Sequence, residues 1–142
     1  MILGASNQSG ISKQPGDPKY VSEIDARRCF DATNKMLGIN FDYLYAPDAS
    51  GAPSTYWRKP CPGMGVVLIE QYRLNPAACV MVGDRGEDKT FAERCGFQFI
   101  HADKELHKWL NGSSHVAFDA FEELLKRCQP LPLSLLEVGC GA

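Results

Sequence analysis

The 142-residue sequence has no apolar run long enough to span a bilayer, and its first residues lack the basic region and the length of a signal peptide. Its six cysteines are scattered and include no C-x-x-C pair, which argues against a zinc site or a disulfide framework. A net charge of −2 offers no general attraction to nucleic acid. These absences favour a cytoplasmic protein with no membrane role, and the length fits one domain.

What the sequence does contain is a pair of carboxylates just past an apolar run. Residues 78–82 are rich in branched side chains and are followed by Gly83, a pattern typical of a parallel strand that runs into a loop. Asp84 and Asp88 then fall at the edge where open α/β sheets bind ligands, and carboxylate oxygens suit Mg²⁺. On the alternative interpretation Asp84 is a loop acid, and Asp88 stabilises the first turn of the helix that it begins.

Two earlier segments bear on that choice. Residues 1–5 form a short apolar run, and the hydroxyl of Ser6 and the amide of Asn7 follow it in a position to contact a phosphate. Arg58 and Lys59 place two cations before a proline-marked helix start, and a lysine is suited to neutralising a phosphoryl group. Alternatively, the first pair is a turn and the second is a solvated surface pair. The order hydroxyl, lysine, paired acids favours phosphate binding.

The segments between these motifs predict alternating strands and helices, and therefore a parallel sheet with helices on both faces. Ser22 and Asp25 resemble a capping box that starts a helix ending at Gly38, with Ile24, Phe30 and Leu37 as its core contacts. The other expected elements are strands over residues 1–5, 41–46, 78–82 and 97–101 and helices over residues 63–72 and 88–95.

The order of the motifs resembles the haloacid dehalogenase superfamily of phosphohydrolases. The closer likeness is to its compact branch, which includes histidinol phosphatase, heptose bisphosphate phosphatase and the polynucleotide 3′-phosphatases. Residues 6–11, 58–64 and 81–88 look like the second, third and fourth motifs of that branch. The resemblance implies phosphomonoester hydrolysis through an aspartyl-phosphate intermediate. The site residues that it implies are a catalytic Lys59, the phosphate-binding Ser6, Asn7, Arg58 and Lys59, and the Mg²⁺ ligands Asp84 and Asp88.

The sequence departs from the family at its first motif. Family members begin with a strand that ends in D-x-D, whose first aspartate attacks phosphorus and whose second acts as general acid and base. This sequence contains no D-x-D. We therefore expect an N-terminally truncated phosphatase, with a three-layer Rossmann-like parallel sheet that lacks its first strand, inactive by itself and marginally stable. The alternative is a non-catalytic remnant that binds phosphate or a partner.

Domain limits and substrate are less constrained. The phosphatase-like domain is expected to cover residues 1–128, and residues 129–142 are expected to be a linker and tail. Residues 135–142 resemble the first motif of S-adenosylmethionine-dependent methyltransferases, either by chance or as the start of a second domain. The stretch before the third motif has no Cys or His, unlike the zinc-bearing heptose enzymes. The expected substrate is therefore a phosphorylated small molecule or a nucleic-acid end, and Trp57 either stacks on a base or packs against the core.

Overall fold

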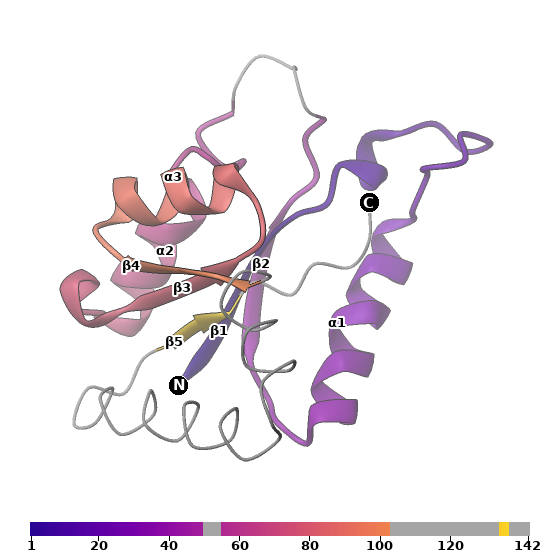
Figure 1. Cartoon of the computed structure of the whole chain (residues 1–142). Helices are drawn as coiled ribbons and strands as arrows, with labels where there is room; N and C mark the ends of the chain where they lie inside the picture. Colours follow the sequence, from indigo (N-terminus) through magenta and orange to yellow (C-terminus); the bar gives the residue numbers. More distant parts are fainter. Residues whose placement is uncertain (50–54, 103–133, 137–142) are drawn as a thin grey trace, which may run out of the picture.

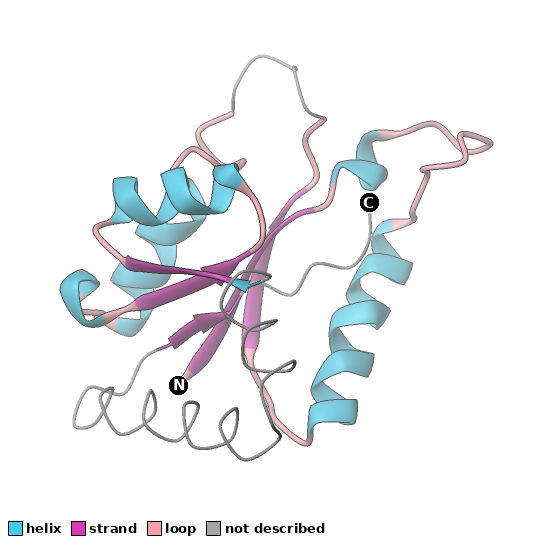
Figure 2. Ribbon diagram, in the orientation of Figure 1, coloured by secondary structure: helices cyan, strands magenta, loops and turns pink. Residues whose placement is uncertain are grey.

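The computed structural model describes residues 1–49, 55–102 and 134–136 (Figure 1). Its centre is a five-stranded sheet in the order β2-β1-β5-β3-β4, and neighbouring strands pair in parallel. The strands are β1 (Ile2–Asn7), β2 (Asp42–Ala46), β3 (Val80–Gly83), β4 (Gln98–His101) and β5 (Ser134–Leu136), and the helices are α1 (Glu23–Leu37), α2 (Gly63–Tyr72) and α3 (Gly86–Cys95). Helix α1 covers one face of the sheet, and α2 and α3 cover the other (Figure 2). The expected α/β fold is confirmed.

The middle of the sheet is occupied by a strand from the far end of the chain. β5 pairs in parallel with β1 on one side and with β3 on the other, so it joins the two halves of the sheet. We expected residues 129–142 to be a linker and tail, and β5 lies within that range. The limits of the expected domain and tail stay a prediction. The backbone groups of β1 and β3 would otherwise lie unpaired inside the sheet, which is a strong reason for a third strand to bind there.

The main core lies between the sheet and the α2–α3 layer, because these helices place small and apolar residues on their inner faces. The two helices approach closely at Gly65, where a Cβ atom would lie 2.3 Å from the Sγ atom of Cys95. The core residues of this layer include Leu3, Ala5, Met64, Leu68, Met81, Phe91 and Ala92. None of the described helices has the length and apolar character needed to cross a membrane.

Helix α1 begins and ends where its capping residues predict. The Ser22 hydroxyl accepts a hydrogen bond of 3.1 Å from the backbone N–H of Asp25, which satisfies one of the donors left open at a helix start. Gly38 ends the helix in the left-handed conformation, with φ at 65°. The predicted Ser22 cap is confirmed. The reciprocal half of a capping box is not observed, because Asp25 Oδ2 accepts a hydrogen bond of 2.6 Å from the Ser22 hydroxyl.

The contact of α1 with the sheet is narrower than we expected. Ala26 and Phe30, one turn apart, are buried, and the Phe30 ring stacks on Tyr43 of β2 with centroids 4.2 Å apart. Ile24 and Leu37 are 64% and 51% exposed, so the prediction that they are core residues is wrong. The buried contact of α1 with the sheet is therefore centred on Ala26 and the ring of Phe30.

Candidate functional site

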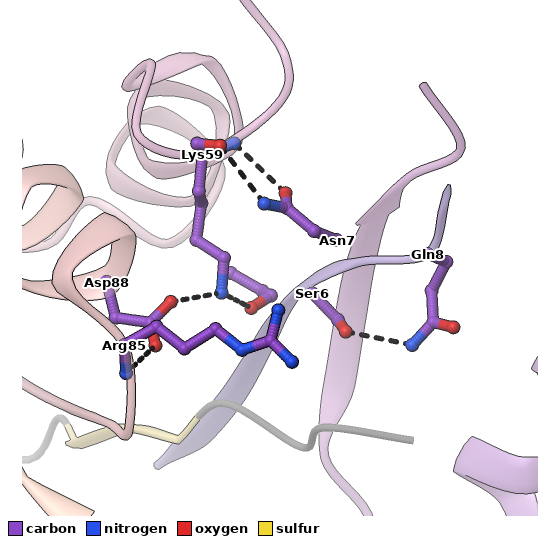
Figure 3. A network of polar contacts seen from close by, with 7 residues as sticks. Ser6, Asn7, Gln8, Lys59, Arg85 and Asp88 are labelled. Atoms are coloured by element: carbon purple, nitrogen blue, oxygen red, sulfur yellow. Dashed lines mark hydrogen bonds and ion pairs between the residues drawn. The ribbon is translucent and has the colours of Figure 1, made fainter. Parts of the chain in front are cut away.

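The predicted motifs meet at the carboxyl edge of the sheet, because β1 and β3 run in the same direction. β1 extends past the expected end at Ala5 and includes Ser6 and Asn7. Lys59 lies in the turn before α2, and Asp88 lies in the first turn of α3. Figure 3 shows these side chains grouped beside the end of β1.

Lys59 is the centre of the cluster. Its side chain is 1% exposed, and its Nζ atom lies 2.9 Å from Asp88 Oδ1. The ammonium group also donates a hydrogen bond of 2.8 Å to the carbonyl of Ala5. β5 pairs with β1 at Ile2 and Leu3, so two residues further along β1 the backbone carbonyl meets the lysine instead of a strand. A fixed positive charge therefore lies at the carboxyl end of the central position of the sheet (Figure 3).

Asn7 holds the backbone of Lys59 in place. Its Nδ2 atom donates to the Lys59 carbonyl at 3.0 Å, and its Oδ1 atom accepts from the Lys59 N–H at 3.0 Å. Both polar groups of the Asn7 side chain are therefore used to position the lysine. Phosphate binding by Asn7 stays a prediction, and its observed contacts give it a positioning role.

Ser6 lies next to the lysine and has a partner that the sequence did not reveal. Its Oγ atom accepts a hydrogen bond of 2.9 Å from Gln8 Nε2, and the two residues are 1% and 6% exposed. A buried hydroxyl and amide at the end of β1 keep a polar pair at the edge where a phosphate would bind. Gln8 carried no separate sequence signal, since a lone glutamine after a strand is common in turns.

Asp88 joins two structures through its two oxygens. Oδ1 contacts the Lys59 ammonium, and Oδ2 accepts a hydrogen bond of 3.0 Å from the Arg85 N–H at the start of α3. The interpretation of Asp88 as a residue of the helix start is therefore confirmed. The residue is also 2% exposed and ion-paired, so one side chain caps α3 and fixes the lysine.

Gly83 allows this arrangement, because a Cβ atom there would lie 2.5 Å from the Cβ atom of Asp88. Gly83→Ala should destabilise the protein by about 1–3 kcal/mol, the usual cost of overpacking a filled site. Urea unfolding followed by circular dichroism measures this cost. Gly86→Ala is the matched control, because no atom lies within 4 Å of the Cβ that it would add. Equal stability of the two variants would contradict the close approach of Asp88 to β3.

Two of the predicted cationic and aromatic side chains have other partners. The Arg58 guanidinium donates a hydrogen bond of 2.9 Å to the backbone carbonyl of Asp48, which holds it in the loop after β2. Trp57 donates from its indole N–H to the Tyr45 carbonyl at 2.8 Å and packs against the core. The packing interpretation of Trp57 is confirmed, and phosphate binding by Arg58 stays a prediction.

Asp84 and Asp88 differ in how well they could bind a metal ion. Among the described residues no group of three or more His, Cys, Asp or Glu side chains could hold a metal. Asp84 is exposed at the end of β3, whereas both oxygens of Asp88 have partners. Mg²⁺ is commonly bound by one or two carboxylates together with waters and substrate phosphate, so Asp84 fits such an ion as a single protein ligand. The joint site of Asp84 and Asp88 stays a prediction.

Two further side chains bear on the chemistry of this edge. Arg85 is exposed between Asp84 and α3, and its guanidinium extends from the helix start in Figure 3. Sequence reasoning did not identify Arg85 as a candidate phosphate contact, because it lies between the two acids Asp84 and Asp88. Burial raises the pKa of the Cys79 thiol, and raises that of Cys95 to about 12, so neither is a thiolate nucleophile at neutral pH.

The described cysteines include both free thiols and a disulfide-bonded residue. Cys61, Cys79 and Cys95 are free, as expected for scattered thiols. Cys29 is disulfide-bonded, which differs from the expectation drawn from the absence of a C-x-x-C pair. Spacing along the chain does not report on pairs that are brought together only by folding.

Comparison with known proteins adds one finding to this geometry. Residues 56–109 match the HAD-hydrolase-like family model. No curated protein matches the chain. The matched segment contains Lys59, Asp84 and Asp88, so it includes two of the three motifs on which the resemblance rests. The match supports membership of the haloacid dehalogenase superfamily, while the compact branch stays a prediction.

Proposed function

We propose that the carboxyl edge of the sheet is the phosphate-binding half of a Mg²⁺-dependent phosphomonoesterase site of the haloacid dehalogenase type. The observation that carries this proposal is the buried Lys59 ammonium, held 2.9 Å from Asp88 Oδ1 beside the end of β1. A cation fixed before the ligand arrives stabilises phosphoryl charge without reorganisation. The HAD-hydrolase-like match over residues 56–109 includes this lysine.

The described residues at this edge divide into those that would bind phosphate and those that position others. Ser6 and Arg85 offer a hydroxyl and a guanidinium to phosphate oxygens, and Lys59 neutralises their charge. Asn7 fixes the Lys59 backbone through two hydrogen bonds of 3.0 Å, and Asp88 fixes its ammonium. The rigidity of the lysine is what this arrangement contributes to binding.

Asp84 would hold the Mg²⁺ ion in this proposal, because it is the exposed carboxylate directly after β3. When bound, the ion would neutralise charge on the phosphoryl group and polarise it. Asp88 would support the metal site indirectly, by positioning Lys59, since its oxygens contact the ammonium and the Arg85 N–H.

Hydrolysis through an aspartyl-phosphate needs a carboxylate that attacks phosphorus and an acid that protonates the leaving oxygen. The sequence has no D-x-D, and Asp88 is committed to Lys59 and to the start of α3. The 142-residue chain therefore binds the phosphate of a small molecule or of a nucleic-acid end and does not hydrolyse it by itself. The absence of D-x-D also favours a second candidate function, a phosphate-binding domain with no catalysis.

Calorimetric titration of the full chain with inorganic phosphate, with and without Mg²⁺, tests this proposal. Binding should require Mg²⁺ and should weaken at least about tenfold, or 1.4 kcal/mol, in Asp84→Asn. Glu70→Gln, which neutralises an exposed carboxylate on α2, should bind as the wild type does. None of the three proteins should hydrolyse p-nitrophenyl phosphate.

Two results would contradict these expectations. Phosphate binding that is independent of both Mg²⁺ and Asp84 would remove the metal from the proposal. Mg²⁺-dependent turnover that disappears in Asp84→Asn would show that the chain supplies its own nucleophile.

A further inference from the structure

A cavity lies outside the Lys59 cluster, beside β2. It has a volume of about 620 Å³, and none of Ser6, Lys59, Asp84 and Asp88 lines it. Its walls come from α1, β2, the loop before α2 and α2 itself, and include Arg27, Tyr43, Tyr45, Trp57, Gln71 and Tyr72. A cavity of this size lies within the range of small-molecule sites, about 300–1,000 Å³.

The cavity wraps around the edge of β2. Tyr43 and Tyr45 face α1, where Tyr43 stacks on Phe30 and Tyr45 accepts a hydrogen bond of 3.1 Å from Arg27 Nε. Asp42 faces α2, where its carboxylate accepts a hydrogen bond from the Tyr72 hydroxyl. Residues from both faces of β2 therefore line the same cavity.

Side chains cover both ends of that edge. The backbone N–H of Phe41 donates to Asn34 Oδ1 at 2.9 Å, and its carbonyl accepts from Asn34 Nδ2 at 3.2 Å. At the other end, the carbonyl of Tyr45 accepts from the indole N–H of Trp57 at 2.8 Å. Such caps are a common protection of an edge strand against pairing with another chain.

Between the two caps lies a short uncovered stretch. Ala46 directs its carbonyl to β1, where it accepts from Gln8 N, and alternate residues of a strand point to opposite edges. The Tyr43 N–H, the Tyr43 carbonyl and the Tyr45 N–H therefore point to the outer edge of β2, away from β1, and both residues line the cavity. Within the described ranges, no side chain or loop backbone forms a hydrogen bond with these three groups.

We propose that this cavity binds a planar heteroaromatic ring of the adenine type. The three edge groups present a donor, an acceptor and a donor in one row, and adenine places an N7 acceptor beside an N6 amino donor on one edge. The rings of Tyr43, Tyr45, Trp57 and Tyr72 supply aromatic walls, and stacking of a base on such a ring contributes about 1–3 kcal/mol. The cation in the wall, Arg27, is already ion-paired with Glu23 at 3.2 Å, which favours an uncharged ring over an anion.

An extended peptide is a poorer match for the same edge. A strand that adds to a sheet needs a continuous row of backbone donors and acceptors. Here the row is closed by Asn34 at Phe41 and by Trp57 at Tyr45, which leaves three groups between them. Three groups suit one ring and are too few for a paired strand.

Titration of the ¹⁵N-labelled full chain with adenosine, followed by amide NMR, tests the proposal. The Tyr43 and Tyr45 amide signals should shift in a saturable manner. N6,N6-dimethyladenosine keeps the stacking ring but lacks the amino donor, so it should bind at least about tenfold more weakly. Gln71→Trp should fill the cavity and abolish the shifts, whereas Gln71→Ala, at the same exposed position of α2, should retain them.

Each of three results would overturn the proposal. The first is the absence of shifts at Tyr43 and Tyr45 at millimolar adenosine. The second is equal binding of the dimethylated analogue, which would indicate stacking without edge recognition. The third is unchanged binding in Gln71→Trp, which would place the nucleoside elsewhere on the protein.

Discussion

Lys59→Met should lower the free energy of unfolding by about 3–5 kcal/mol, because it leaves the Asp88 carboxylate buried without its ion-pair partner. The two side chains are 1% and 3% exposed, so water cannot replace the lost ammonium. Asp88→Leu should have an effect of similar size from the other side of the pair. Denaturant unfolding of each variant measures the loss.

The double variant Lys59→Met/Asp88→Leu separates the ion pair from the packing around it. Replacing both partners with apolar residues removes two buried charges together, so the double variant should be more stable than either single variant. Lys89→Met is the matched control, since the Lys89–Glu93 pair on α3 is 63% and 60% exposed, and its loss should cost less than about 1 kcal/mol. Single variants of Lys59 and Asp88 as stable as the control would contradict a buried pair.

Ending the chain before Ser134 should abolish the cooperative unfolding transition. Among the described strands, β5 alone pairs with both the β2–β1 half and the β3–β4 half of the sheet. Without it, the inner edges of β1 and β3 would expose backbone groups that each cost about 1–3 kcal/mol when unsatisfied. Thermal unfolding followed by circular dichroism, with light scattering for aggregation, measures the result.

A milder change tests the same strand in the full chain. Leu135→Pro removes a backbone donor from β5, whereas Leu135→Ala keeps it, so the difference between the two isolates the strand pairing. The proline variant should be less stable than the alanine variant by about 2 kcal/mol or more. A truncated chain that unfolds cooperatively at the wild-type temperature would show that β5 does not hold the sheet together.

The sequence predicted the elements with strong local signals. Capping by Ser22 and Gly38 indicated the limits of α1, and the proline-marked start before residue 63 indicated the start of α2, because these signals depend on neighbouring residues alone. The meeting of Ser6, Lys59 and Asp88 followed from parallel strands whose carboxyl ends share one edge. β5 could not be predicted in this way, since a three-residue strand shows no periodicity and pairs with residues more than fifty positions away.

The direction of individual side chains was also beyond the sequence. Arg58 and Lys59 are neighbours, yet the first bonds to Asp48 in the loop and the second enters the core. Asp88 was weighed as either a metal ligand or a residue of the helix start, and its two oxygens allow it to cap α3 and to pair with Lys59 together. Such choices depend on which partners folding brings within 3 Å, and the order of residues does not encode them one by one.

The most direct measurement is a crystal structure of the full chain soaked with Mg²⁺ and tungstate, a dense oxyanion that substitutes for phosphate. The proposed function predicts an oxyanion in contact with Lys59 Nζ and Ser6 Oγ, and a metal ion on Asp84. An oxyanion bound elsewhere, or an empty edge with the Lys59–Asp88 pair intact, would contradict a phosphate site at the carboxyl edge of the sheet.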